Sequence, residues 1–270
     1  MTNVPVGIEK AVASVKKSTV AIISRTFDVK TGEPRKPIAG SGVVIGEGLV
    51  LTCAHVLRYE PSEVTWKGYE VMSDADFDPK REPQPTWAAQ FVSADETCDL
   101  AVLRVAGLKA PPVVLRDPCD CSAGTSVFWV GHPHGEVSPI VGAGIIASLQ
   151  TVPTYPGGPK SPVPGFRLDT TTFKGNSGGG LFDDDGLLVG INNAGPWLVR
   201  PDLLPALKAV HNEAGSLVAG VDVVGVLRSI LEDMAGKSLS GIAFAIHGDV
   251  VREAVAKLSA KGPTSSSRPS

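Results

Sequence analysis

Three short segments of the chain carry a histidine, an aspartate and a serine, the groups that a nucleophilic hydroxyl requires around it. The segments are Thr52–Val56 with His55, Cys98–Val102 with Asp99, and Gly175–Gly179 with Ser177. A serine hydroxyl becomes a nucleophile when a neighbouring base takes its proton and an acid fixes the tautomer of that base. The sequence therefore predicts that His55, Asp99 and Ser177 act together as a catalytic set.

Ser177 lies in a glycine-rich stretch, GNSGGG, which runs from Gly175 to Gly180. Glycine lets the backbone adopt conformations that a side chain forbids, so the amides of Gly175 and Ser177 can point together at a carbonyl oxygen that becomes anionic. We expect this oxyanion hole to be formed by Gly175, Asn176 and Ser177. Removal of one such donor typically lowers turnover by about 10²–10³.

The same stretch has other interpretations when it is taken alone. It fits a glycine-rich hairpin turn with an incidental serine, a phosphate-binding turn, or the G-x-S-x-G elbow that precedes a helix. The elbow also requires an acid and a base downstream, for which Asp222 and His247 are the only fair candidates. A short strand and the turn sequence DDDG follow Ser177 instead of a helix, so the context disfavours the elbow.

His55 and Asp99 also have plainer structural interpretations. A histidine in an apolar setting is often a core residue, although imidazole is also the usual general base near neutral pH. Asp99 directly precedes the apolar run LAVLRV, where a carboxylate is costly to bury without a partner. We therefore expect the ring N–H of His55 to be its partner. The alternatives are a strand-capping role for Asp99 and Asp95 as the acid.

The remaining pattern is mainly β. Gly, Pro and Asp clusters separate short β-branched runs, as in an all-β barrel or sandwich. The predicted strands are Val20–Ser24, Ser41–Ile45, Gly48–Thr52, Glu63–Val71, Ala88–Val92, Leu100–Val105, Ser126–Val130, Ile140–Leu149, Gly165–Asp169, Gly180–Phe182, Leu187–Asn192 and Ser240–Ile246. Amphipathic periodicity predicts helices over Ile8–Ser18 and over Asp249–Ala260, the latter capped by Gly248 or Asp249. Asp183–Gly186 predicts a hairpin turn.

Composition excludes several classes of protein. The 270 residues carry a net charge of −3, with 43% hydrophobic and 20% charged residues, which is typical of a globular protein and indicates no nucleic-acid or membrane partner. No apolar run reaches the roughly 18–20 residues of a membrane span, and residues 1–17 do not resemble a secretory signal. We expect a cytoplasmic protein without a metal or cofactor. Its four cysteines are interpreted as free thiols, with a redox or metal role as the alternative.

Five runs together resemble the trypsin-like HtrA serine proteases. They are GSGVVIGEGLVLTCAHVL, CDLAVLRV, VGHPHGEVSPIVGAGIIASL, KGNSGGGLFDDDGLLVGINNAG and SGIAFAI. The order His, Asp, Ser agrees, since it is the chymotrypsin-type order and not that of subtilisins or α/β-hydrolases. The resemblance implies a chymotrypsin-like double β-barrel, two six-stranded antiparallel barrels with His55, Asp99 and Ser177 between them. The activity implied is a serine endopeptidase acting on proteins or peptides.

The domain boundaries follow from this resemblance. We expect one protease domain over residues 1–261, with a first barrel at about 18–110, a second at about 122–250, and a disordered tail at 262–270.

The chain departs from the family in ending soon after its last helix, where a PDZ domain is usual, so PDZ-based regulation is not expected. It also departs in having His132 and His134 where the family often has GNPFG. An HxH pair is a weak zinc signal, so we interpret it as a structural loop.

A third departure is an insertion of about 45 residues, Pro196–Leu239. Within it, Leu203–Asn212 and Val221–Met234 are predicted helices. The insertion is either a helical excursion packed on the second barrel or a lid, an exosite or a contact with a regulatory partner or a second copy. The sequence leaves both interpretations open.

Activation and specificity are also inferred from the resemblance. Asn176 stands where secreted zymogens carry the aspartate that pairs with a new N-terminus, so we expect no trypsin-style activation and look instead to ordering of Lys174–Asn176. The matching primary pocket is formed by Thr171, Thr172, Asn193, Ala194 and Gly195. No acid stands at its base, which favours cleavage after small or medium uncharged residues over cleavage after Lys or Arg.

Two other functions remain open at this point. One is a peptide-binding or chaperone-like pseudo-protease that keeps the fold without hydrolysis. The other is a protease module that becomes active only when a partner recruits or assembles it. The complete set of His55, Asp99 and Ser177 favours an active endopeptidase.

Overall fold

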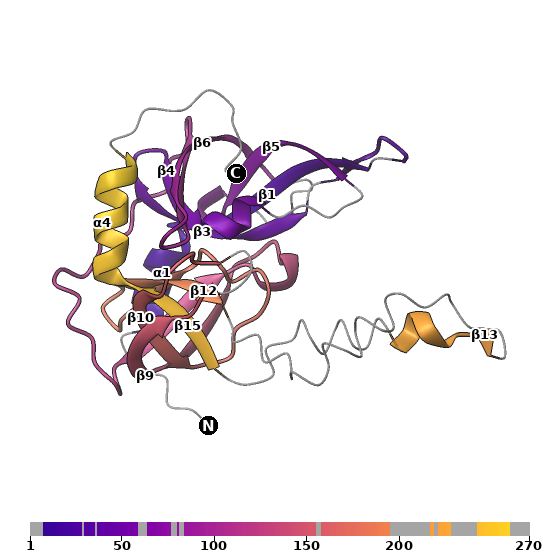
Figure 1. The fold of residues 1–270 in the computed structure, drawn as a ribbon. Coiled ribbons are helices and arrows are strands. Elements are labelled where there is room, and N and C mark those ends of the chain that lie inside the picture. Colours follow the sequence, from indigo (N-terminus) through magenta and orange to yellow (C-terminus); the bar gives the residue numbers. More distant parts are fainter. Residues whose placement is uncertain are drawn as a thin grey trace.

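The computed structural model describes residues 8–28, 30–35, 37–58, 64–76, 80, 84–154, 158–194, 217–218, 221–227 and 242–259. They form two β-barrels that lie against each other, and helix α4 runs along one side of both (Figure 1). No helix within these ranges is long and apolar enough to cross a membrane.

Six strands close the first barrel. Its strands are β1 (Thr19–Asp28), β3 (Ile38–Gly46), β4 (Leu49–Cys53), β5 (Val64–Ser73), β6 (Trp87–Asp95) and β7 (Leu100–Val105), with β2 (Pro34–Arg35) added at the end of β1. They pair in the order β1-β3-β4-β7-β6-β5, and a further pairing of β5 with β1 closes the ring. Alternating apolar residues such as Val20, Ile22 and Val71 fill the interior.

The second barrel is also closed by six strands. They are β8 (Ser126–Gly131), β9 (Ile140–Val152), β10 (Val163–Asp169), β11 (Gly180–Phe182), β12 (Leu188–Ala194) and β15 (Ile242–His247). The order is β10-β15-β12-β11-β8-β9, and β9 pairs with β10. Phe128, Phe166 and Phe182 are fully buried in this half, and the rings of Phe128 and Phe182 stack with centroids 5.5 Å apart.

This architecture confirms the predicted mainly-β double barrel. Every predicted strand is present, although several extend further than the sequence pattern indicated, among them β1 and β9. The predicted hairpin turn Asp183–Gly186 joins β11 to β12. There the Asp183 carboxylate accepts the N–H groups of Asp185 and Leu187, and Gly186 adopts the left-handed φ of 80° that the turn requires.

The two predicted terminal helices are present, but the first ends at Lys16, two residues before the predicted Ser18, and the last begins one residue early. Helix α1 (Ile8–Lys16) buries Ile8, Ala11 and Val15, which belong to its predicted apolar face. Helix α4 (Gly248–Ser259) begins one residue before the predicted start. Its cap is therefore His247 and not Gly248 or Asp249, because His247 Nδ1 accepts the Asp249 N–H at 3.2 Å. Burial lowers the pKa of His247, which favours the neutral ring that this bond needs.

Short turns complete the described part of the chain. Single 3₁₀ turns lie at Ala54–Arg58, Asp74–Asp76 and Pro133–Gly135. Within the insertion, β13 (Leu217–Val218) pairs with β14 (Val221–Asp222), and residues 223–227 are helical. The predicted helix Val221–Met234 was thus wrong at its start, since Asp222 caps the helix by accepting the Gly225 N–H at 3.0 Å. Its remainder and the predicted helix Leu203–Asn212 lie outside the described residues.

Candidate active site

His55 and Asp99 are brought together by the pairing of β4 with β7. His55 lies in the 3₁₀ turn after β4, and Asp99 immediately precedes β7; Cys53 and Leu100 are register partners. Asp99 Oδ2 lies 2.6 Å from His55 Nδ1, and Asp99 Oδ1 accepts the His55 backbone N–H at 2.8 Å. The Asp99 side chain is completely buried. This is the partnership that the sequence predicted for a buried carboxylate.

The competing acid, Asp95, has a different role. Its carboxylate accepts the Thr97 N–H at 3.0 Å and pairs with Lys257 of α4 at 2.6 Å. The hydrogen bonds from Lys257 and Thr97 lower the pKa of Asp95 against the opposing effect of its burial. Asp95 therefore holds the turn before β7 and links it to α4, whereas Asp99 holds the imidazole.

A third residue at the pair is Asn193 of β12. Its side-chain Nδ2 donates to Asp99 Oδ2 at 2.8 Å, so the second barrel reaches across to the acid of the first. Its backbone carbonyl accepts the Ser177 hydroxyl at 2.9 Å. The sequence placed Asn193 in the substrate pocket, but its contact with Asp99 depends on how the barrels dock, which no local pattern reveals.

The Ser177 loop leaves two backbone donors for a ligand. The N–H of Asn176 donates to the Phe173 carbonyl, that of Gly178 to the Asn192 carbonyl, and that of Gly179 to the Asn176 carbonyl. Among the described residues, none accepts the N–H of Gly175 or Ser177. These are the two predicted oxyanion donors. Asn176 was included in the predicted hole, but its own N–H is already used to hold the loop.

The orientation of the Gly175 N–H group is fixed by a hydrogen bond on the opposite side of its peptide group. The Lys174 carbonyl accepts the His134 N–H at 2.7 Å, and a trans peptide bond turns the Gly175 N–H to the opposite side. Gly175 has φ 102°, and a Cβ there would lie 2.4 Å from the His132 carbonyl oxygen. Only glycine fits this place.

Ser41 of β3 ties the loop to the first barrel. Its hydroxyl donates to the Gly175 carbonyl at 2.7 Å and accepts the His132 N–H at 2.8 Å. Its backbone N–H donates to the Ser177 carbonyl at 2.9 Å. Ser41 is fully buried. Sequence reasoning missed it because a serine in a Gly-Ser-Gly strand has no local signal for such a contact.

Comparisons with known proteins identify the family of this chain. The profile of the family described as a trypsin-like peptidase domain matches residues 40–191, more than half of the chain. The chain belongs to this family of trypsin-like peptidase domains. The match includes His55, Asp99 and Ser177.

Similar proteins carry protease names. Mitochondrial serine protease HTRA2 of Drosophila grimshawi is 32% identical over 69% of this chain and 42% of its own length. Serine protease PepD of Mycobacterium tuberculosis is 29% identical over 71% of this chain and 40% of its own length. The peptidase domain therefore spans less than half of these curated relatives.

Solved structures show the same fold at low identity. The active form of the Rv3671c protease from M. tuberculosis has a TM-score of 0.60 and 20% identity, covering 98% of this chain and 95% of that one. The HtrA-type protease AlgW with a decapeptide has a TM-score of 0.62 and 21% identity, covering 94% and 67%.

The HxH pair of the peptidase domain forms a structural loop. His132 Nδ1 donates to the Glu136 carbonyl at 2.9 Å, and burial lowers the pKa of His132 to about 4. The His134 ring lies against Phe173, with centroids 5.0 Å apart. These contacts engage the two rings in different ways, which supports the structural interpretation.

One group of side chains has the spacing of a metal site, namely Cys53, His55 and Asp99. The donor set does not suit a metal. His55 Nδ1 and Asp99 Oδ2 already bind each other, and burial raises the pKa of Cys53 well above its usual value, which keeps the thiol protonated. All four cysteines are free, as expected from the sequence, and all four are buried.

A narrow cavity opens beside Ser177. It has an accessible volume of about 10 Å³, room for about one water molecule, and lies between residues from the serine loop, β12 and β15. The lining residues are Thr172, Phe173, Asn176, Ser177, Asn192, Asn193 and Phe244. Thr172 and Asn193 were predicted here. Asn192 and Phe244 were not, because they reach the cavity only through the closure of the second barrel.

The other predicted pocket residues do not line this cavity or cannot be placed in it. Thr171 is exposed and lies outside the lining set, whereas the adjacent Thr172 is buried. Ala194 ends β12, and its side chain lies outside the described residues, as does Gly195. Of the predicted set, Thr172 and Asn193 line this cavity, whereas Thr171 does not.

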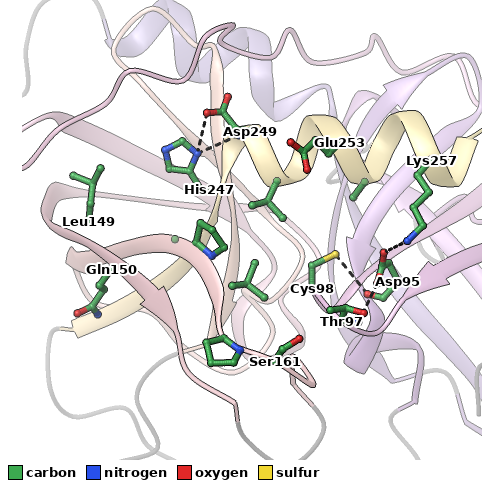
Figure 2. A pocket seen from close by; sticks show the side chains of 16 residues that line it. Asp95, Thr97, Cys98, Leu149, Gln150, Ser161, His247, Asp249, Glu253 and Lys257 are labelled. Carbon is green, nitrogen blue, oxygen red and sulfur yellow. Dashed lines mark hydrogen bonds and ion pairs between the residues drawn. The ribbon is translucent and has the colours of Figure 1, made fainter.

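A larger cavity, of about 660 Å³, lies at the start of the Asp99 turn (Figure 2). Asp95, Thr97 and Cys98 form one wall, α4 contributes Glu253 and Lys257 to another, and β9 and β10 close it. In Figure 2 the Lys257 side chain reaches across to Asp95, and His247 faces Asp249.

Proposed function

We propose that this chain is a serine endopeptidase domain that hydrolyses peptide bonds of protein or peptide substrates through His55, Asp99 and Ser177. The observation that carries the proposal is the Asp99–His55 pair of the first barrel together with a serine loop in the second barrel whose two flanking N–H groups have no acceptor among the described residues. Membership of the trypsin-like peptidase family supports it.

The chemistry follows from the contacts. Ser177 Oγ turns from the Asn193 carbonyl and attacks the peptide carbonyl carbon while its proton passes to His55 Nε2, since Nδ1 is held by Asp99. The N–H groups of Gly175 and Ser177 stabilise the oxyanion. His55 then gives the proton to the leaving amine, and water hydrolyses the Ser177 ester by the same steps in reverse.

Substrate preference and control form part of the same proposal. The cavity beside Ser177 is narrow and has no charged side chain among the lining residues that the structure describes, which supports cleavage after small or medium uncharged residues. Asn176 cannot form the ion pair of trypsin-like zymogens, so control acts through the ordering of Lys174–Asn176. We also propose a cytoplasmic location, supported by the four unpaired cysteines.

A fluorophosphonate probe tests the catalytic proposal directly. We expect covalent labelling at Ser177 and cleavage of a denatured protein substrate. In Ser177→Ala and His55→Ala we expect the rate to fall by about 10³-fold or more. Circular dichroism and thermal unfolding of each variant check that the fold is kept.

The outcomes separate the competing functions. A folded protein that binds peptides but is never labelled would be a pseudo-protease. Labelling that appears only after assembly or addition of a partner would identify a recruited protease module. Labelling of Ser177→Ala as fast as the unmodified chain would contradict the assigned nucleophile.

A further inference from the structure

The cavity beside Ser177 contains buried polar atoms that lack partners. Thr172 Oγ1 and Asn192 Oδ1 have no hydrogen-bond partner among the described residues, and the two residues are only 5% and 3% exposed. Both line the cavity, one from the serine loop and one from β12. Leaving such an atom unsatisfied costs about 1–3 kcal/mol, so both atoms are candidates for contact with a ligand.

The amide of Asn176 is a separate case. Its Oδ1 and Nδ2 also lack partners among the described residues. However, a Cβ added at Gly131 would lie 3.1 Å from Asn176 Oδ1, which places this amide against β8. We therefore do not assign it to the wall formed by Thr172 and Asn192.

The chemistry of the two atoms defines what they can bind. A carboxamide oxygen only accepts hydrogen bonds, whereas a threonine hydroxyl both donates and accepts. Asn192 Nδ2 is already directed at the Gly180 carbonyl, at 3.5 Å, which leaves Oδ1 as the acceptor. A side chain that satisfies this cavity must therefore offer a hydrogen-bond donor.

The size and charge of the cavity further limit which substrate side chains it can bind. The cavity is narrow, and its described lining residues include no acid that could balance Lys or Arg. Phe173 and Phe244 supply its apolar walls. A small neutral side chain with one donor group fits these conditions, as in serine, threonine or asparagine. A purely aliphatic side chain of the same shape would leave both polar atoms unsatisfied.

We propose that Thr172 and Asn192 make this domain cleave after small neutral residues that carry a hydrogen-bond donor, in preference to aliphatic residues of equal size. The proposal rests on the endopeptidase function above and specifies its substrates. A site built around buried hydrogen-bonding groups discriminates against an analogue that lacks the partner more strongly than an apolar pocket discriminates by size.

Isosteric peptide pairs provide the test. One pair differs only by threonine against valine on the amino side of the cut, the other by asparagine against leucine. We expect kcat/KM to be about 10–100-fold higher for the donor-bearing member of each pair, the effect of one or two buried hydrogen bonds. The Thr172→Val variant should lower the threonine-to-valine ratio several-fold, because only Asn192 Oδ1 then remains to accept the donor, and Thr172→Ser should keep most of the ratio.

The same substitution outside the cavity is the control. Thr151 is exposed on β9, so Thr151→Val should leave the ratio as it is in the unmodified chain. Equal or faster cleavage of the valine and leucine peptides by a protein that the fluorophosphonate labels would overturn this proposal and leave the endopeptidase function intact. If the threonine-to-valine ratio of kcat/KM is unchanged in Thr172→Val, Thr172 does not contribute to the preference.

Failure of the proposed function gives a different result. If no peptide is cleaved and no labelling occurs, the endopeptidase assignment is wrong. Binding of the same peptides to the Ser177→Ala variant then decides the inference by itself. Tighter binding of the threonine and asparagine peptides supports the donor preference, and equal or tighter binding of the valine and leucine peptides contradicts it.

Discussion

His132 shows how one buried side chain supports the site at the scale of a residue. Its carbonyl lies behind Gly175, and its backbone N–H donates to Ser41. Because Nδ1 donates to the Glu136 carbonyl, the neutral ring leaves Nε2 as an acceptor, and Nε2 is buried with no partner among the described residues. Protonation would place an unpaired charge there.

The pH dependence of stability follows from this. Burial lowers the pKa of His132 to about 4 from its ordinary value of 6.5, and the charge of Lys16 acts in the same direction. Between pH 6.5 and pH 4, His132 therefore binds a proton in the unfolded chain but stays neutral in the folded chain. The contribution of neutral His132 to the free energy of unfolding is fully present above pH 6.5 and declines as the pH falls. Below pH 4 this contribution, about 3 kcal/mol, is completely lost.

Urea unfolding between pH 7 and pH 4 checks this expectation. The variant His132→Asn keeps a side-chain donor for the Glu136 carbonyl and does not titrate in this range. It should lose less stability than the unmodified chain as the pH falls. If the two proteins follow parallel curves, His132 is not the group responsible.

At the scale of elements, β3 and the serine loop depend on each other. The Ser41 hydroxyl bonds both Gly175 and His132, while Gly178 passes so close that a Cβ there would lie 2.1 Å from the Ser41 carbonyl oxygen. A strand of the first barrel thus sets the position of the loop that carries the nucleophile in the second.

Ser41→Ala should weaken catalysis more than it weakens the fold. We expect kcat to fall by about 10–100-fold, because the buried hydrogen bonds from the Ser41 hydroxyl to the Gly175 carbonyl and from the His132 N–H to Ser41 are lost, with a stability loss of about 1–3 kcal/mol. Ser24→Ala is the matched control. Ser24 is also buried on a strand of the first barrel, but its hydroxyl has no partner among the described residues. A kcat for Ser41→Ala within twofold of that of Ser24→Ala would contradict the role of Ser41.

At the scale of the whole molecule, α4 joins the two barrels. It contacts β6 and β7 of the first barrel and β12 and β15 of the second (Figure 1). Val251, Ala254 and Leu258 form its buried face, and Lys257 pairs with Asp95 beside the Asp99 turn. The helix therefore holds together the two halves whose docking assembles the site.

Leu258→Ala should lower global stability. Leu258 is fully buried, and replacing a buried leucine by alanine typically costs about 2–5 kcal/mol. Denaturant unfolding followed by tryptophan fluorescence measures the loss, and activity should disappear at the same denaturant concentration as the folded signal. Activity that outlasts the loss of folded signal would show that α4 is not needed to dock the barrels.

Much of the site was readable from local pattern. The apolar run after Asp99 predicted a buried carboxylate that needs a partner, and the glycines around Ser177 predicted converging amides. Contacts between distant strands were not readable. Asn193 and Ser41 act through contacts 94 and 134 residues away in the chain, and Asn192 and Phe244 meet only because β12 pairs with β15. His247 was missed as a cap because the start of α4 was placed one residue late.

The sequence by itself determined the kinds of group and the strands that carry them, because hydrophobic alternation, glycine and side-chain chemistry act within a few residues. Tertiary structure decided which groups meet. Closure of each barrel sets the register that puts His55 beside Asp99, and docking of one barrel on the other brings Asn193 to that acid. Closure of the second barrel also decides which polar atoms beside Ser177 remain without partners, since it brings the serine loop, β12 and β15 together from parts of the chain far apart in sequence.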